Sequence, residues 1–267
     1  MVEFREMGVR RFGLVNWLGL YTLASREVQR FMAIWMQTVL APMVTAGLFL
    51  LVFSLAFGAE RGAVMGVPFL NFLAPGILMM SVLQNAFANT SSSIVVSKVQ
   101  GNIVDTLMPP LSPAELVAGF VAGGAIRGLL VALAIGVMLV AGLGIWAVHP
   151  VWALVFIMLG GIFMGGLGML AGIYANKFDQ TAAITNFLVT PLSFLSGTFY
   201  SIEKLPPAMQ TISRGNPIFY LIDGVRFGVI GRSDSSPWLG LVVSLVSCFV
   251  VLVIGWHMFR RGYRLKP

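Results

Sequence analysis

Residues 32–57 read MAIWMQTVLAPMVTAGLFLLVFSLAF and contain no charged side chain. Roughly 20 apolar residues in a helix suffice to cross a hydrocarbon core about 30 Å thick. Five further segments are similarly long and predominantly apolar: 69–88, 116–143, 151–175, 181–199 and 239–259. The sequence therefore predicts an all-α membrane protein, with six transmembrane helices in one transmembrane domain over residues 1–267.

The composition of the whole chain agrees with this interpretation. Hydrophobic residues make up 58% and charged residues 10%, against roughly 25% charged in a typical soluble domain. A disordered, nucleic-acid-binding or disulfide-stapled protein is therefore excluded as a class. The single cysteine, Cys248, has no partner for an internal disulfide.

The basic residues predict the orientation of the chain in the membrane. If the N-terminus is cytoplasmic, 11 of the 17 Lys and Arg residues fall on that side, five fall on the other side, and Arg127 lies within a span. Cytoplasmic loops carry the excess of Lys and Arg. We therefore expect a multi-pass protein of the cytoplasmic (inner) membrane with both termini cytoplasmic.

Residues 14–31 precede the first span and mix apolar with charged side chains. The apolar set is Trp17, Leu18, Tyr21, Val28 and Phe31, and the charged set expected in water is Arg26, Glu27 and Arg30. This pattern is typical of an amphipathic helix that lies in the membrane interface. A simple extension of the first span is the alternative.

The sequence matches neither the phosphate-binding loop motif nor the HExxH zinc motif. A phosphate-binding loop needs Lys followed by Ser or Thr, whereas the four lysines precede Val99, Phe178, Leu205 and Pro267. The two histidines belong to no HExxH helix, which makes a zinc site improbable. We therefore expect neither catalytic residues nor a bound cofactor or metal in this chain.

Glycines four residues apart mark two neighbouring spans. The pairs are Gly119 and Gly123, Gly124 and Gly128, Gly161 and Gly165, and Gly168 and Gly172. Small residues at this spacing let helix backbones approach closely in a membrane. The pairs predict that the spans 116–143 and 151–175 pack tightly together.

Arg127 is the one charge inside a predicted span. A charged side chain at the centre of a helix costs roughly 2.5–3.5 kcal/mol on insertion scales, so it needs a partner. No acidic residue lies three or four positions away. The partner is expected from another helix, a second protomer or a lipid phosphate, with substrate contact as a further alternative.

The loop after the second span contains a candidate short helix at 97–108. Val99, Ile103 and Leu107 recur every four residues, Ser97 is a possible cap, and Pro109 and Pro110 end the pattern. Such a helix either rests on the membrane surface or docks a soluble partner.

The last external connection, 201–226, is too polar and too rich in proline to span the membrane, yet it carries interleaved apolar residues. Two short interfacial or re-entrant helices around Gly215-Asn216-Pro217 fit this pattern best. An ordinary surface loop is the alternative.

Several of these segments resemble a known family. The segments are the N-terminal helix with Arg26-Glu27, Phe72-Leu73-Ala74-Pro75-Gly76, the loop ending Leu107-Met108-Pro109-Pro110-Leu111-Ser112-Pro113, and the external signature of Pro206, Asn216, Pro217, Tyr220, Asp223 and Arg226. With them the chain resembles the membrane subunit of ABC-2 type exporters. The resemblance implies six spans, a second copy of the permease, and two copies of a separate ABC ATPase that holds ATP and Mg.

The resemblance also implies that 97–108 is the coupling helix. Its contact residues would be Val99, Gln100, Gly101, Asn102, Ile103, Asp105 and Leu107. Val99, Ile103 and Leu107 are expected to insert into a groove of the ATPase, with Asp105 at the rim, where relatives often carry Glu.

The favoured function is thus a permease subunit that exports an amphiphilic, lipid-like, drug-like or glycan-linked substrate by ATPase-driven conformational change. Phe187, Phe194 and Phe199, at roughly helical spacing beside Pro191, are candidate path residues. An ion-coupled secondary transporter is the alternative, although such proteins usually place Asp, Glu or His inside spans. A membrane enzyme is disfavoured by the missing motifs.

Overall fold

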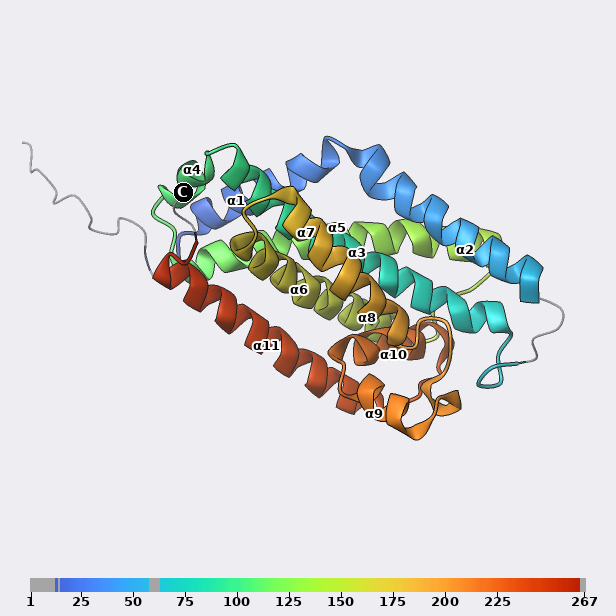
Figure 1. Cartoon of the computed structure of the whole chain (residues 1–267). Helices are drawn as coiled ribbons and strands as arrows, with labels where there is room; N and C mark the ends of the chain where they lie inside the picture. The colour runs from blue at the N-terminus through green and yellow to red at the C-terminus, as the bar shows by residue number, and fades with distance from the viewer. Residues whose placement is uncertain (1–12, 14, 58–62, 265–267) are drawn as a thin grey trace, which may run out of the picture.

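The computed structural model describes residues 13, 15–57 and 63–264, and within them the chain is helical, with one isolated bridge between Val64 and Val67 instead of strands. In chain order the elements are α1 (Trp17–Met32), a π-helical segment η1 (Met36–Leu40), α2 (Ala41–Phe57), α3 (Phe69–Val99), α4 (Ile103–Leu107), α5 (Pro113–Leu143), α6 (Pro150–Tyr174), α7 (Phe178–Ile184), a second π-helical segment η2 (Thr185–Val189), α8 (Thr190–Leu195), a 3₁₀ turn η3 (Ile202–Lys204), α9 (Pro207–Arg214), α10 (Pro217–Ile230) and α11 (Pro237–Arg261). Figure 1 shows the long helices lying side by side as one bundle.

Five helical segments of the described chain are long and apolar enough to cross a membrane: Met36–Ala56, Phe69–Val99, Pro113–Leu143, Pro150–Tyr174 and Pro237–Arg261. The predicted span at 181–199 is absent from this set. That stretch forms α7, η2 and α8 in succession, and the helix ends at Leu195. It stops there because Ser196 leaves helical geometry and Gly197 adopts a left-handed φ of +78°.

Glycines bring α6 into close contact with α5, as the sequence predicts. A Cβ placed on Gly161 would lie 2.9 Å from Ala125 Cα of α5, and one on Gly124 would lie 3.1 Å from Gly165 Cα. Any larger side chain at these positions would push the two backbones apart. The close approach of α5 and α6 is therefore confirmed for Gly124, Gly161 and Gly165.

Other glycines of these pairs contact helices α3 and α1. A Cβ on Gly168 would lie 2.3 Å from the Phe87 carbonyl of α3, and Gly172 faces Ser91 of the same helix. Gly119 of α5 instead meets Leu23 of α1. Glycine spacing therefore predicts close packing correctly but does not identify every partner.

The bundle has two structurally different ends (Figure 1). α1, α4 and the C-terminal end of α11 lie together at one end, and α9 and α10 lie at the other. α1 packs through Leu23 and Phe31, both of which are buried. The expectation that Glu27 stays in water is wrong, because its side chain is fully buried against α3 and α5.

Candidate functional site

A polar network joins α1, α3 and α4 at one end of the bundle. Arg26 Nη1 of α1 donates to Thr106 Oγ1 of α4 at 2.8 Å. The buried Glu27 carboxylate accepts from Ser93 Oγ of α3 at 2.7 Å. Its oxygens also pair with the guanidinium groups of Arg26 and Arg30, each at 3.2 Å. A buried carboxylate needs such partners to offset the loss of water, and here they tie three helices together.

Arg30 extends this network deeper along α3. Its Nη2 donates to both the carbonyl oxygen and Oδ1 of Asn89, at 2.7 and 2.9 Å, and its Nη1 donates to Ser92 Oγ at 3.3 Å. α1 is thus fixed to α3 by charged hydrogen bonds as well as by apolar packing.

A polar hollow of about 490 Å³ opens between α1, the end of α3 and α4. Its lining includes Arg26, Glu27, Arg30, Ser93, Ser97, Gln100, Asn102 and Asp105. Both signs of charge therefore face one cavity, next to the segment for which the family resemblance predicts a coupling role.

The helix expected at 97–108 is shorter than predicted. The segment 97–108 is two pieces: α3 continues to Val99, and α4 covers only Ile103–Leu107. Gly101, at φ +74°, reverses the chain between them. Ser97 lies inside α3 and does not cap a helix, so the predicted start is wrong.

The faces of α4 also differ from the prediction. Ile103 is only 7% exposed and packs in a cluster that includes Leu23 and Leu116. The prediction that Ile103 inserts into a groove of a partner is therefore wrong, because its side chain is buried in the core of this chain. The exposed apolar side chains are instead Val99, Val104 and Met108, at 52%, 46% and 75%.

The remaining predicted coupling residues lie around this surface. Gln100, Gly101, Asn102 and Asp105 are exposed, and Leu107 is half-buried. A periodicity argument alone does not separate Val104 and Met108 from the buried positions, because the turn at Gly101 changes the phase of the pattern.

A buried ionic cluster organises the opposite end. Arg226 of α10 is fully buried, and its Nη1 lies 3.6 Å from Asp223 Oδ1 and 3.7 Å from Asp234 Oδ2. Its Nη2 donates to the Gly197 carbonyl at 2.5 Å, and its guanidinium lies 4.1 Å from the centre of the Phe72 ring. One side chain thus contacts α3, the α8–η3 turn, α10 and the α10–α11 loop.

The two carboxylates of this cluster have further partners. Asp223 accepts from the backbone N–H groups of Asp234 and Ser235 at 2.8 and 2.9 Å, and Asp234 accepts from Ser201 Oγ. Burial raises the pKa of Asp223 to about 6, and the nearby Arg226 guanidinium opposes part of that rise.

The other signature residues build the same end. Asn216 caps α10 by accepting from the Ile218 N–H at 3.1 Å and donates to Ser196 Oγ at 2.8 Å. Pro206 precedes α9, Pro217 begins α10, and Tyr220 is 8% exposed. The chain forms two helices around Gly215-Asn216-Pro217, α9 and α10, and their interfacial or re-entrant placement stays a prediction. Sequence reasoning missed Asp234, which no helical spacing links to Arg226.

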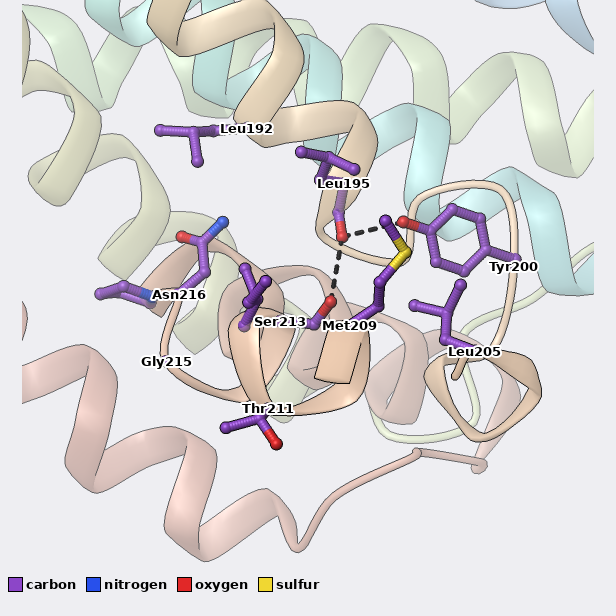
Figure 2. A pocket seen from close by; sticks show the side chains of 11 residues that line it. Leu192, Leu195, Tyr200, Leu205, Met209, Thr211, Ser213, Gly215 and Asn216 are labelled. Carbon is purple, nitrogen blue, oxygen red and sulfur yellow. Dashed lines mark hydrogen bonds between the residues drawn. The ribbon is translucent and has the colours of Figure 1, made fainter. Parts of the chain in front are cut away.

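An apolar pocket of about 440 Å³ lies between α8 and α9 (Figure 2). Leu192 and Leu195 of α8 line one wall, and Leu205 and Met209 line another. The Leu195 carbonyl accepts from Tyr200 Oη at 2.9 Å and from Ser213 Oγ at 3.4 Å, as the dashed lines in Figure 2 show. The pocket is thus apolar with its few polar groups already bonded.

The predicted path phenylalanines separate into two groups. Phe194 and Phe199 stack with ring centres 5.3 Å apart, and Phe199 also meets Phe53 and Phe49 of α2 at 5.5 and 5.9 Å. Phe187 is 79% exposed on the π-helical segment. The structure thus joins two of the three to α2 and leaves Phe187 on the surface of the chain.

Arg127 finds its partner on a neighbouring helix. It is 9% exposed, and its Nη2 donates to Asn85 Oδ1 of α3 at 3.1 Å. Within the described residues no carboxylate pairs with it. The partner is therefore an amide, which leaves the positive charge of Arg127 without a counter-ion.

Comparison with known proteins gives consistent matches. Residues 19–230 match the family described as ABC-2 type transporter. The chain is 36% identical over 262 residues to the inner membrane transport permease YadH of Escherichia coli K12. The aligned region covers 94% of this chain and 98% of that protein. It is 25% identical over 252 residues to nodulation protein J of Rhizobium leguminosarum bv. viciae, covering 93% and 95%. A nodulation protein J of Sinorhizobium fredii is 28% identical over 205 residues, covering 75% and 77%.

Proposed function

Because the chain belongs to the ABC-2 type transporter family, we propose that it is the permease subunit of an ATP-driven exporter in the inner membrane. Two copies of a separate ABC ATPase bind ATP and Mg and hydrolyse the nucleotide. This chain binds no cofactor itself, and pairs with a second copy of itself to form the path. The relative from E. coli, named an inner membrane transport permease, supports the location and the role.

In this proposal the chain crosses the membrane six times. The sixth crossing is the continuous helix 178–195 of α7, η2 and α8, which is about 27 Å long at 1.5 Å per residue. An even number of crossings returns the chain to its starting side, in agreement with the position of α1 and the end of α11 at one end of the bundle (Figure 1). The charge distribution assigns that end to the cytoplasm.

The hydrogen bond from Arg26 to Thr106 is the observation that carries the coupling mechanism. ATP binding closes the ATPase pair and displaces α4, where Val104 and Met108, the residue directly after the helix, are exposed for contact. Arg26 transmits the displacement to α1, and the bonds of Glu27 and Arg30 transmit it to α3. A packed charged network moves as a unit because breaking it would leave buried charges unpaired.

The cargo in this proposal is amphiphilic. The stacked rings of Phe194, Phe199 and α2 offer an apolar surface near the opposite end, and the apolar pocket between α8 and α9 lies at the same end. Tilting of the spans exposes this surface alternately to the two sides of the membrane. Apolar walls suit an acyl or aromatic group better than a free sugar.

The test is reconstitution of the tagged full chain with an ABC ATPase encoded beside its gene. We expect a stable complex that hydrolyses ATP, and no hydrolysis by the permease alone after contaminating ATPases are removed. An ATPase whose phosphate-loop lysine is replaced serves as the control. Transport driven by an ion gradient without any ATPase would instead support a secondary transporter and contradict the proposal.

A further inference from the structure

One face of α3 is polar although the helix is long enough to cross the membrane. Ser81, Gln84, Asn85 and Ser92 follow one another at roughly helical spacing and are half-buried. Polar side chains within spans face the protein interior or water-filled space and mark ligand pathways. These four side chains give α3 a polar, half-buried face.

Two buried donors on this side of the bundle have no acceptor. Arg127 Nε and Asn89 Nδ2 are both inaccessible to solvent and make no hydrogen bond within the described chain. Asn89 Oδ1 accepts from Arg30, which fixes the amide with Nδ2 pointing the other way. A buried donor without an acceptor costs roughly 1–3 kcal/mol, and more for a charged group.

The two donors lie on neighbouring turns of α3 and α5. Asn89 is one helical turn beyond Asn85, the residue that bonds Arg127. A Cβ placed on Gly123, one turn before Arg127 on α5, would lie 3.3 Å from Asn89 Nδ2. The same Cβ would lie 2.5 Å from Glu27 Cβ, so Gly123 leaves room for the Glu27 side chain and brings the Asn89 amide close to α5.

The charges of this region do not balance. Arg26, Arg30 and Arg127 carry three positive charges, whereas Glu27 and Asp105 are the two carboxylates near Arg26 and Arg30. Glu27 pairs with the first two, and the described chain supplies none for Arg127. An anion bound here would balance the surplus positive charge and accept hydrogen bonds from the two unbonded donors.

We propose that Arg127 and the Asn89 amide bind the anionic group, such as a phosphate, sulfate or carboxylate, of an amphiphile on the polar face of α3. The guanidinium offers Nε and a second nitrogen in a planar fork that matches such oxygens. This proposal rests on the exporter function in one respect only: it takes the bound amphiphile to be the cargo.

The direct test measures binding of dodecyl phosphate to the full chain in phosphatidylcholine nanodiscs, with protein-free nanodiscs as background. Dodecyl maltoside is the uncharged probe of equal chain length. We expect dodecyl phosphate to bind at least about tenfold more weakly to Arg127→Gln, and with intermediate affinity to Arg127→Lys, because Lys keeps the charge but lacks the planar fork. Arg260→Gln, an exposed arginine, is the matched control and should bind as wild type does.

A second variant keeps the test independent of folding defects. Asn89→Asp removes the unbonded Nδ2 donor and gives Arg30 a carboxylate partner, so it should raise the melting temperature and weaken the binding of dodecyl phosphate. Equal binding by wild type and Arg127→Gln, equal binding of the two probes, or no binding of dodecyl phosphate by wild type would overturn the proposal. A lower melting temperature for Asn89→Asp would overturn it as well.

Two further arms identify the source of the anion. Suppression of dodecyl phosphate binding in phosphatidylglycerol nanodiscs assigns the site to a membrane lipid headgroup, and competition by inorganic phosphate assigns it to a free anion. Retention of the ABC ATPase is measured on the same preparations. Intact, Arg127-dependent binding without ATPase retention would refute the exporter function and leave the anion site standing.

Discussion

At the scale of single residues, Arg226 holds the α9–α10 end together. It is fully buried and is shared by two carboxylates, a backbone carbonyl and an aromatic ring that come from separate segments. A buried ion pair adds little stability over an apolar replacement, but removal of one partner leaves the other charge buried and unpaired. The structure at this end therefore depends on the presence of all members.

Replacing Arg226 with Gln should strongly destabilise the chain. The change leaves Asp223 and Asp234 without their counter-ion, at a cost of about 3–5 kcal/mol. The measurement is the apparent melting temperature in detergent, with Arg232→Gln as control because Arg232 is exposed in the neighbouring loop. Equal melting temperatures for the two variants would show that the cluster contributes nothing to stability.

Asp223 should make stability depend on pH in a defined direction. Its pKa in the folded chain is about 6, above the value of about 3.9 in an unfolded chain. The protonated form is thus favoured by folding, so the contribution of Asp223 is complete below about pH 4 and is lost as pH rises through about 6.

The check compares wild type with Asp223→Asn from pH 4 to 7. The melting temperature of wild type relative to the variant should fall as pH rises, by an amount equivalent to at most about 3 kcal/mol for two pKa units. A difference that stays constant or rises with pH contradicts the assigned shift.

The sequence predicts only part of these residue-level contacts. Asp223 and Arg226 stand three apart on one helix, so their pairing is expected locally. Asp234 lies beyond the end of α10, and no periodicity connects it to Arg226. Glu27 is a charged residue, for which the sequence predicts exposure to water. Its burial follows from its contacts with Ser93 and Arg30 in the folded chain.

At the scale of elements, the turn at Gly101 decides which face of α4 is available. The sequence pattern reads 97–108 as one helix, but the left-handed Gly101 divides it and rotates the following residues. Ile103 then enters the core, while Val104 and Met108 remain exposed. Backbone reversals of this kind are not visible in hydrophobic spacing, which is why the predicted contact face was wrong.

Aspartate at Ile103 and at Val104 should have different consequences. Ile103→Asp buries a charge in the cluster with Leu23 and should destabilise the chain by several kcal/mol, about 3 or more. Val104→Asp changes an exposed site and should alter stability by no more than about 0.5 kcal/mol. Thermal melting distinguishes them, and an equally stable Ile103→Asp would contradict the burial described for α4.

Helix α6 gives a second test at this scale. Gly168→Ala would place a methyl group 2.3 Å from the Phe87 carbonyl and force α3 and α6 apart, so we expect a lower melting temperature. Gly136→Ala on α5 meets no atom within 4 Å and should be neutral or stabilise by up to about 1 kcal/mol. If both variants melt alike, the close α3–α6 contact does not govern packing.

At the scale of the whole molecule, apolar runs predict the bundle well, because burial in lipid requires long helices whose length the bilayer fixes. Four of the five candidate spans agree closely in position with the apolar segments, and α3 extends further to Val99. The exception is 181–199, whose helix ends at Leu195 because the chain turns at Gly197. Long-range partners such as Asn85 for Arg127 follow from packing and are not encoded locally.

The central claim is that this chain is driven by a separate ABC ATPase that contacts the exposed surface of α4. The most direct measurement is the amount of ATPase retained by the tagged chain at matched membrane abundance, for wild type, Met108→Asp and Ile212→Asp. Met108 and Ile212 are both exposed, at 75% and 69%, but lie at opposite ends of the bundle. We predict that Met108→Asp lowers retention at least about fivefold, as expected for a contact residue, and that Ile212→Asp leaves it unchanged. Equal retention by all three chains, or no ATPase bound to wild type, would contradict the claim.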